Sequence, residues 1–437
     1  MYHKRMLSSD TLIIFTTSPT GLGHIRVTNA LIKGLPKELP YHTIGINDSV
    51  IEGFYRLIST NWLLRETMEY FQTNQTAEKL QTQLFTWYEH NNTSCTTTEL
   101  QNIIKANPQT KKVVIISTHA QLARRIQKII EQKIIQIPIF HTVIVTDDSP
   151  QRLWAVCSSL VIVPSHKTLQ ELTKTFVCDR LHKGEIIVAP YPINPKLTEE
   201  LSESSLTDRR KQLCATCEES TRICIPISGA AVQLKYLQTL ITSLIEQNGS
   251  KIRFSFDIIT KEAPYTTNFI HTIKQNPEVT IHKSQTNTKT VEIYDQLYES
   301  THPPSIEITK PSEQCFKVLT SPKTKGGVLL LLTQPVGRQE YDNLNYLERN
   351  GFLPTKDFHT RLWKTMESDI TMLDYKPLSA YRALMLPSDP KRTANLIKLC
   401  LQNKVFEAMY DYTGYEENYQ LSPHGVERIW QLISERT

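Results

Sequence analysis

A short apolar run that leads through a glycine-containing turn directly into a helix is the most constraining feature of this chain. Residues 11–17 are mostly β-branched or apolar over the length of one strand. Gly21 and Gly23 follow in the turn, and apolar residues then recur at helical spacing. Such a turn lets backbone N–H groups approach a phosphate or a developing oxyanion, and the helix start adds partial positive charge. His24 stands at this helix start, where an imidazole can act as an acid or a base near neutral pH.

The same turn lacks the third glycine of the dinucleotide-binding fingerprint. Arg26 follows Ile25 where that motif continues toward its last glycine. A plain NAD-binding interpretation is therefore weak.

Short apolar runs alternate with helical stretches through the first half of the chain. The expected strands are 11–17, 42–46, 112–117, 139–146, 159–163 and 185–189. The expected helices are 24–34, 50–70, 77–90, 98–106, 119–132 and 166–176. Alternation of this kind predicts a mainly parallel α/β sheet that is covered by helices on both faces.

A polar, charged stretch interrupts the alternation, which then restarts. The second set of expected strands is 222–227, 252–259, 279–282, 305–309 and 328–333, and the expected helices are 231–247, 264–275, 289–299 and 340–350. Residues 357–437 are expected to be helical throughout. Because 437 residues exceed one ordinary domain, we predict two doubly wound lobes with a ligand cleft at the carboxyl ends of their strands. The expected parts are an N-terminal lobe (1–193), an interlobe linker (194–220), a second lobe (221–355) and a helical C-terminal segment (356–437).

Composition and charge exclude several classes of protein. A formal charge of +5 is small for this length and argues against a nucleic-acid binder. The first ten residues lack the apolar core of a signal peptide, and the longest apolar run, 328–332, is far too short to span a bilayer. We therefore expect a cytosolic chain with reduced thiols. Cys214 and Cys217 form a Cys-x-x-Cys pair without the further ligands of a zinc site, and we interpret it as incidental.

Several segments resemble motifs of one enzyme family, in the order in which that family has them. In the first half they are Ser18-Pro19-Thr20-Gly21-Leu22-Gly23-His24-Ile25, Ser117-Thr118-His119, Val145-Thr146-Asp147-Asp148 through Trp154, Val163-Pro164-Ser165 and Val188-Ala189-Pro190-Tyr191-Pro192-Ile193. In the second half they are Ile308-Thr309-Lys310-Pro311-Ser312-Glu313 and Pro335-Val336-Gly337-Arg338-Gln339-Glu340-Tyr341-Asp342-Asn343. Together they resemble the GT-B glycosyltransferases related to the monogalactosyldiacylglycerol synthases and MurG, as a divergent member.

Two segments depart from the family pattern. The phosphate loop that usually opens the second lobe is reduced to Ile227-Ser228-Gly229-Ala230-Ala231. Residues 314–327, where the family has a helix, are expected to form a lysine-containing loop. Both departures lie in the lobe that binds the nucleotide-sugar donor in this family.

The resemblance implies an inverting, metal-independent transfer of a sugar from a nucleotide diphosphate, with UDP as the expected nucleotide, to a hydroxyl or lipid acceptor. A GT-B site stabilises the leaving diphosphate with helix N-termini and basic side chains, so we expect no metal and no cofactor beyond the nucleotide-sugar. By resemblance, His24 is the base or orients the acceptor, and Asp147 or Asp148 orients a histidine or a hydroxyl. Gly21, Gly23 and His119 are then the acceptor-side loop. Each of these residues has a structural alternative as a helix cap or a turn former.

The expected donor site lies in the second half of the chain. Ser228, Gly229 and Ala230 are expected to offer backbone N–H groups to the diphosphate, and Glu313 to accept hydrogen bonds from ribose hydroxyls. By resemblance, the remaining contacts to the nucleotide-sugar come from Lys310, Arg338, Gln339, Glu340 and Asn343.

Two other functions remain open, namely a nucleotide-sugar 2-epimerase and a non-catalytic GT-B-like protein that binds a nucleotide-sugar or a partner. A contact with the inner face of a membrane is also open, because helix 119–136 mixes Arg124, Arg125 and Lys128 with isoleucines. Its apolar face is equally expected for a helix that covers a sheet.

Overall fold

The computed structural model describes most of the chain, and its contacts divide it into two compact units. The described residues are 7–18, 21–35, 39–45, 74–179, 181, 184–229, 231–249, 252–320, 323–335, 337–368, 378, 380–412 and 419–437. The first unit comprises Met1–Pro195, Gly337–Gln339 and Asn418–Thr437, and the second comprises Lys196–Val336 and Glu340–Glu417. The expected helix 50–70 lies outside the described residues.

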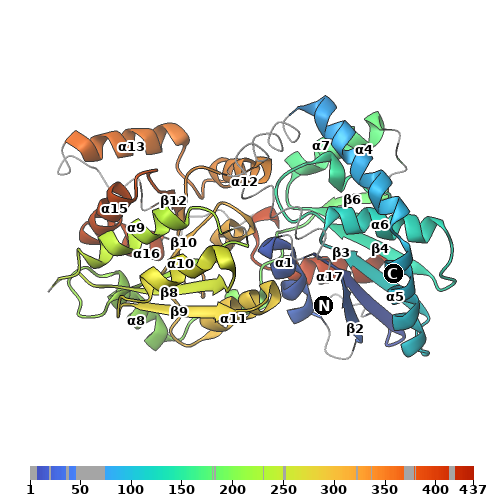
Figure 1. Cartoon of the computed structure of the whole chain (residues 1–437), viewed down its shortest axis with the longest axis horizontal. Helices are drawn as coiled ribbons and strands as arrows, with labels where there is room; N and C mark the ends of the chain where they lie inside the picture. The colour runs from blue at the N-terminus through green and yellow to red at the C-terminus, as the bar shows by residue number, and fades with distance from the viewer. Residues whose placement is uncertain are drawn as a thin grey trace. The chain divides into compact units, whose positions relative to one another are not determined.

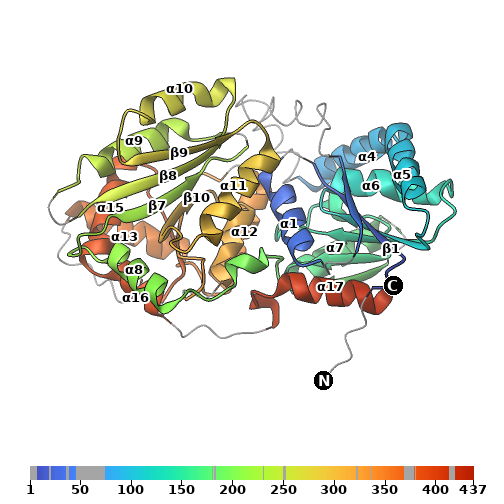
Figure 2. The same ribbon diagram turned by 90° about the horizontal axis from the view of Figure 1, so that it is seen from below.

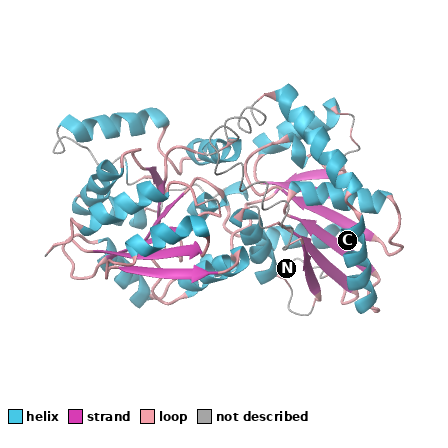
Figure 3. Ribbon diagram, viewed as in Figure 1, coloured by secondary structure: helices cyan, strands magenta, loops and turns pink. Residues whose placement is uncertain are grey.

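Six described strands form a parallel sheet in the first unit (Figures 1 and 3). They are β1 (Thr11–Thr16), β2 (Tyr41–Ile44), β3 (Lys112–Ser117), β4 (Ile139–Ile144), β5 (Leu160–Val163) and β6 (Glu185–Val188), in the spatial order β2-β1-β3-β4-β5-β6. All neighbouring pairs run parallel, with Thr16 opposite Ser117 in the β1–β3 pair. The continuous apolar runs of β1 and β3 are buried because helices cover both faces.

Helices from distant parts of the sequence cover the two faces of this sheet. They are α1 (Leu22–Lys33), α4 (Gln75–Asn91), α5 (Ser94–Ala106), α6 (Ala120–Glu131), α7 (His166–Cys178) and α17 (Gly425–Arg436), with a short 3-10 helix η1 (Arg152–Trp154). Figure 2 shows α17 below the sheet and α4, α5 and α6 above it. On the upper face, Leu12 and Ile14 pack in one core cluster with Ile126 of α6.

The C-terminal helix α17 belongs to the first unit and packs against α1. The indole nitrogen of Trp430 donates a hydrogen bond of 2.9 Å to the carbonyl of Leu31 at the end of α1. Gly34 follows α1, and a Cβ at this position would lie 2.1 Å from Cγ1 of Val426. The chain therefore needs a glycine here for α17 to approach α1.

The second unit contains another sheet of six described strands. They are β7 (Thr221–Pro226), β8 (Phe254–Lys261), β9 (Val279–Ser284), β10 (Ile306–Thr309), β11 (Val328–Leu331) and β12 (Ala383–Met385), in the order β12-β11-β10-β7-β8-β9. Their pairs are again parallel. The expected strands of both sheets are confirmed, with ends that differ by a few residues.

Helices cover the second sheet as they do the first. They are α8 (Glu203–Leu213), α9 (Leu234–Ile245), α10 (Pro264–Ile273), α11 (Asn287–Glu299), α12 (Arg338–Arg349), α13 (Lys356–Ser368), α15 (Pro390–Gln402) and α16 (Val405–Asp411). Short 3-10 helices are η2 (Pro195–Leu197) and η3 (Glu313–Leu319). A further 3-10 helix, η5 (Tyr419–Leu421), belongs to the first unit. Leu206 and Leu213 of α8 join the main core cluster of the second unit. The segment 194–220 thus contributes apolar side chains to a core although its composition is polar.

Two expectations about local structure are wrong. Within 357–437, residues Ala383–Met385 form β12, because pairing with Leu329 and Leu331 of β11 outweighs the helical preference of an Ala-Leu-Met segment. Residues 314–319 belong to the 3-10 helix η3 and are buried, where a lysine-containing loop is expected. Phe316 and Leu319 supply the apolar surface that draws this segment inward.

Lys317 of η3 is held in a polar cluster inside the second unit. Its ammonium forms an ion pair with Glu307 of β10, and the lysine side chain is 3 % exposed. Glu307 also accepts hydrogen bonds from Tyr294, at 2.8 Å, and Tyr298, at 2.6 Å. The Lys317 nitrogen lies 3.7 Å from the ring centroid of Tyr298. Burial lowers the pKa of Lys317, and the charge of Glu307 opposes that shift.

No helix among the described residues is long and apolar enough to cross a membrane.

Candidate functional site

The strand order of the first sheet places two histidine-bearing loops side by side. β1 and β3 are neighbours, and the sheet continues in opposite directions from them. Open parallel sheets bind ligands beyond the carboxyl ends of the two strands at such a switch point. The loop after β1 leads to His24, and the chain after β3 continues through Thr118 to His119. The structure therefore brings together two residues that lie 95 positions apart in the sequence.

The ring of His24 has a defined orientation and tautomer. Its Nδ1 lies 2.7 Å from the carbonyl oxygen of Thr118 and 3.3 Å from Oγ1 of Thr146. A carbonyl oxygen can only accept, so Nδ1 carries the proton and donates it. In this neutral tautomer Nε2 carries the lone pair, as a general base requires. The residues that set this tautomer, Thr118 and Thr146, were missed as functional residues because only the fold brings them to His24.

His119 packs against His24 and caps α6. The two rings meet edge to face with their centroids 4.9 Å apart. His119 accepts a hydrogen bond of 3.5 Å from the backbone N–H of Leu122. Burial above all, and then the electrostatic effect of the neighbouring His24 and Arg125, hold its pKa well below 6.5. His119 is therefore neutral at physiological pH and does not compete with His24 for a positive charge.

The two aspartates after β4 lie in different surroundings. Asp148 is fully buried and accepts hydrogen bonds from Thr168 Oγ1, at 2.8 Å, and from the Ser165 hydroxyl. Ser165 is the N-cap of α7, so Asp148 stabilises the start of that helix. Asp147 is half-buried.

The glycines of the first loop lie at the start of α1. Gly21 is the extended N-cap residue, and Gly23 is the second residue of the helix. A Cβ at Gly21 would lie 4.0 Å from Cδ2 of His24, so the backbone of this loop runs close to the ring.

Two further histidines are buried as neutral groups and predict acid sensitivity. Burial lowers the pKa of His141 to about 3 and that of His359 to about 4, from an ordinary value of 6.5. Below pH 6.5 the unfolded chain takes up protons at these positions and the folded chain does not, so stability is lost as pH falls from 6.5 toward 4. From pH 7 to pH 5 we expect a loss of about 2 kcal/mol per histidine, measured by urea unfolding. His141→Asn should reduce the change in the free energy of unfolding with pH, whereas His302→Asn, which replaces an exposed histidine, should leave that change as it is. A free energy of unfolding that does not vary with pH would contradict the prediction.

The second sheet has its own switch point, between β7 and β10. The loop after β7 contains Ser228 and Gly229, and the turn after β10 contains Lys310 and leads to Glu313 at the start of η3. The strand order thus places four of the expected donor-site residues at the carboxyl ends of the two strands where ligands bind in such sheets.

Helix α12 holds the turn after β10. Lys310 forms an ion pair with Glu340, and the amide of the fully buried Asn343 donates a hydrogen bond of 3.2 Å to the carbonyl of Pro311. Glu313 is half-buried at the start of η3. Three expected donor residues, Lys310, Glu340 and Asn343, therefore belong to one set of contacts.

The loop after β7 combines open space with an unusual backbone. A Cβ at Gly229 would meet no atom within 4 Å, and the buried Ser228 Oγ has no hydrogen-bond partner among the described residues. Ala231 and Gln233 have φ values of 49° and 61°, in the left-handed region. The Gln233 amide donates a hydrogen bond of 2.8 Å to the carbonyl of Thr333. This bond connects the loop after β7 to the loop after β11. Such strain is concentrated at ligand sites in many proteins; Ala230 lies outside the described residues.

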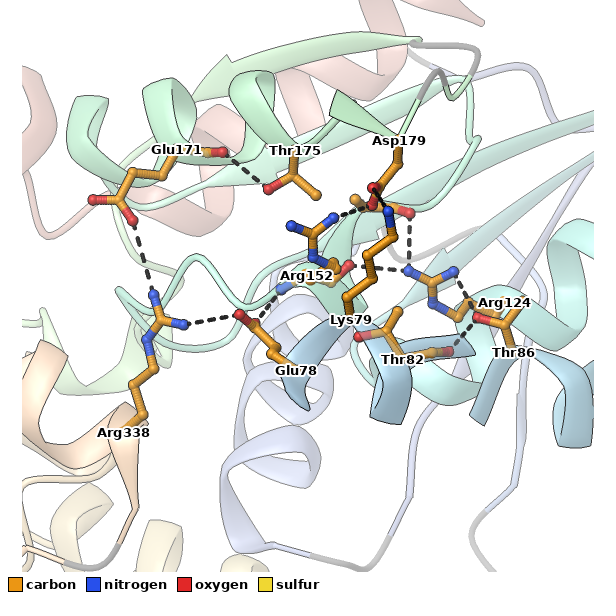
Figure 4. A network of polar contacts seen from close by, with 11 residues as sticks. Glu78, Lys79, Thr82, Thr86, Arg124, Arg152, Glu171, Thr175, Asp179 and Arg338 are labelled. Atoms are coloured by element: carbon orange, nitrogen blue, oxygen red, sulfur yellow. Dashed lines mark hydrogen bonds and ion pairs between the residues drawn. The ribbon is translucent and has the colours of Figure 1, made fainter. Parts of the chain in front are cut away.

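Arg338 and Gln339 are grouped with the first unit, although α12 continues into the second. Arg338 lies 3.4 Å from the Glu78 carboxylate and 3.8 Å from that of Glu171 (Figure 4). Two carboxylates therefore surround the guanidinium that we expect to meet a phosphate. Gln339 is half-buried.

Two of the basic side chains of α6 lie inside the unit and not on its surface. Arg124 is 6 % exposed and donates to the carbonyls of Leu153, at 3.0 Å, and Ala155, at 3.1 Å. Arg125 is 9 % exposed and pairs with Glu89 at 2.7 Å. These two arginines are therefore buried and do not contribute to a basic surface, and the expected membrane contact stays a prediction. Among the described residues, no group of three or more His, Cys, Asp or Glu side chains is arranged to hold a metal ion.

Known protein-family models and curated protein sequences contain no match to this chain. Solved structures do resemble it over nearly its whole length. A putative UDP-N-acetylglucosamine 2-epimerase from Listeria monocytogenes is 8% identical, with a TM-score of 0.51 over 97% of this chain and 96% of that one. The S. aureus MnaA–UDP structure is 11% identical, with a TM-score of 0.49 over 97% and 96%, and Acinetobacter baumannii MurG is 11% identical, with a TM-score of 0.44 over 97% and 99%. The likeness to the Listeria structure and the two parallel sheets confirm the predicted GT-B fold.

Proposed function

We propose that this chain is an inverting, metal-independent glycosyltransferase that transfers a sugar from a UDP-sugar to a hydroxyl or lipid acceptor. The observation that carries this proposal is the hydrogen bond from His24 Nδ1 to the Thr118 carbonyl. It leaves Nε2 as the basic atom of the ring, at the carboxyl end of the central strands, where a ligand of this sheet binds. The motif order shared with the monogalactosyldiacylglycerol synthases and MurG supports the same group of enzymes.

In the proposed reaction, His24 Nε2 accepts the proton of the acceptor hydroxyl as the oxygen attacks the anomeric carbon of the sugar. The bond from that carbon to the diphosphate oxygen breaks on the opposite face, so the configuration inverts. UDP leaves as a dianionic or more highly charged diphosphate that needs positive potential. The N–H groups of the loop at Ser228 and Gly229, together with Lys310, are the proposed source of that potential in the second unit.

UDP is the proposed nucleotide because the Listeria protein with the same fold is named for a UDP-sugar. Within the described part of the chain, the Ser228 hydroxyl has no hydrogen-bond partner and a Cβ at Gly229 meets open space, and both observations support a ligand at this loop. The same name also supports a second candidate reaction, the 2-epimerisation of a UDP-sugar. An epimerase acts on the nucleotide-sugar alone, whereas a transferase needs an acceptor.

The decisive experiment is thermal unfolding of the full chain with UDP, other nucleoside diphosphates and UDP-sugars. At one hundred times its dissociation constant a ligand stabilises the folded state by about 2.7 kcal/mol, which is easily seen as a shift in Tm. We expect this shift with UDP, and we expect Glu313→Ala to reduce it through loss of the ribose contact. Glu292→Ala, which changes an exposed glutamate of α11, should leave the shift intact.

Two results would overturn the proposal. One is the absence of a Tm shift with every nucleotide, which would favour a partner-binding protein. The other is conversion of UDP-N-acetylglucosamine into its 2-epimer without an acceptor, detected by NMR, which would favour the epimerase.

A further inference from the structure

The turn between α8 and β7 brings two cysteines of the second unit close together. The backbone N–H of Cys217 donates a hydrogen bond of 3.3 Å to the carbonyl of Cys214, which closes a turn over these four residues. A turn of this kind keeps the Cα atoms of its first and last residues within about 7 Å of each other. A disulfide requires a Cα–Cα distance of roughly 4.4–6.8 Å, so the backbone holds the two cysteines near the separation that a disulfide spans.

The two thiols of this turn differ in how readily they ionise. Sγ of Cys214 lies 3.3 Å from Oγ1 of Thr216, whose hydroxyl can donate to a thiolate. Hydrogen bonding with the Cys217 thiol, and then with this hydroxyl, lowers the pKa of Cys214, whereas the bond between the two thiols raises the pKa of Cys217 to about 11. Cys214 is therefore the nucleophile of the pair, and Cys217 retains its proton at neutral pH.

Both ends of the turn are fixed to the rest of the unit. Leu213, the last residue of α8, is fully buried in the core cluster. On the β7 side, Thr221 Oγ1 donates a hydrogen bond of 2.7 Å to the carbonyl of Gln212. An ion pair of 3.3 Å between Lys211 and Glu219 spans the turn. Because the folded chain already holds these ends together, a bond between the two thiols requires little further ordering of the backbone.

Burial separates this pair from the cysteines of the core. Cys214 and Cys217 are half-buried, which leaves them accessible to a small reagent. Cys224 and Cys400 are fully buried, and burial raises the pKa of each thiol. Buried cysteines of this kind are inert, whereas access and a lowered pKa coincide at Cys214.

We propose that Cys214 and Cys217 form a redox-active dithiol that a small disulfide, such as oxidised glutathione, converts into an intramolecular disulfide. The Cys214 thiolate attacks one sulfur of glutathione disulfide, which forms a mixed disulfide and releases one glutathione as a thiolate. The Cys217 thiol then loses its proton, its sulfur attacks Sγ of Cys214, and the second glutathione leaves. The two cysteines lose two electrons and two protons, and glutathione disulfide takes them up as it becomes two thiols.

This inference revises the interpretation of the pair as incidental. The sequence supplies only the spacing of the two cysteines, whereas the structure adds the turn, the hydroxyl of Thr216 and access from solvent. The inference does not depend on the proposed transfer reaction.

The test is oxidation of the full, folded chain in glutathione buffers, followed by alkylation with N-ethylmaleimide, trypsin digestion and mass spectrometry. One tryptic peptide, residues 212–222, contains both cysteines, because Lys211 precedes it and Arg222 ends it. We expect this peptide to lose two hydrogens and to escape alkylation at a glutathione disulfide concentration at which less than about one tenth of Cys95 carries a mixed disulfide. The reason is the high effective concentration of the second thiol within the same turn.

Two variants separate the roles of the groups in the turn. Cys217→Ser should stop the reaction at the mixed disulfide, so that Cys214 carries one glutathione. Thr216→Val removes the hydroxyl beside Cys214 and should slow the alkylation of Cys214 by iodoacetamide at pH 7 severalfold. Cys95→Ser, which removes an exposed cysteine of α5, is the matched control and should leave the oxidation of peptide 212–222 unchanged.

Three results would overturn the inference. The first is a 212–222 peptide that is still alkylated twice after exposure of the wild-type chain to excess glutathione disulfide. The second is a Cys217→Ser chain that forms no mixed disulfide at Cys214. The third is faster alkylation of Cys217 than of Cys214 in the reduced wild-type chain.

Discussion

His24→Ala should lower kcat about 10²–10⁴-fold while the affinity for UDP stays unchanged, because the variant removes the general base and leaves the second-unit loops intact. The reason is the tautomer that Thr118 imposes: its carbonyl takes the Nδ1 proton and leaves Nε2 to receive the proton of the acceptor. The measurements are initial rates with saturating UDP-sugar and the Tm shift with UDP alone.

A second variant separates chemistry from structure at this position. His24→Asn retains an N–H group that can donate to the Thr118 carbonyl but has no basic nitrogen. We expect it to be as inactive as His24→Ala and as stable as the wild type. His166→Ala, which replaces an exposed histidine at the start of α7, serves as the matched control. Recovery of activity in His24→Asn would show that His24 acts only by holding its loop.

The second large effect is expected at Lys317, in the interior of the second unit. Lys317→Met should lower the free energy of unfolding by about 3–5 kcal/mol, because it leaves the carboxylate of Glu307 buried without a counter-charge. The two tyrosine hydroxyls that donate to Glu307 remain, but they carry no charge. Urea unfolding monitored by circular dichroism gives the difference.

The double variant tests whether the unpaired charge is the cause. Adding Glu307→Gln to Lys317→Met removes the carboxylate and keeps an oxygen for the tyrosine hydroxyls, so most of the lost stability should return. Lys289→Met, in an exposed ion pair with Glu292, should cost no more than about 1 kcal/mol. If the double variant is no more stable than Lys317→Met alone, lost packing of the lysine chain is the cause instead.

Much of the fold could be predicted because its signals are local. A strand such as Lys112–Ser117 is six residues long with four consecutive β-branched apolar residues, and few structures other than a buried parallel strand suit that pattern. The turn before His24 could be found for the same reason, since strand, glycines and helix follow one another without interruption. The segments that failed, Ala383–Met385 and 314–319, are short, and their conformations depend on partners far away in the sequence.

By itself, the sequence determined the two parallel sheets, all of their described strands except β12, and the placement of His24 at a glycine turn. The tertiary structure alone decided which nitrogen of His24 is the base, because the Thr118 carbonyl reaches it from another strand. It also decided that α4 turns its polar face inward. An amphipathic pattern specifies two faces of a helix, but only the arginines of neighbouring segments determine which of them is buried.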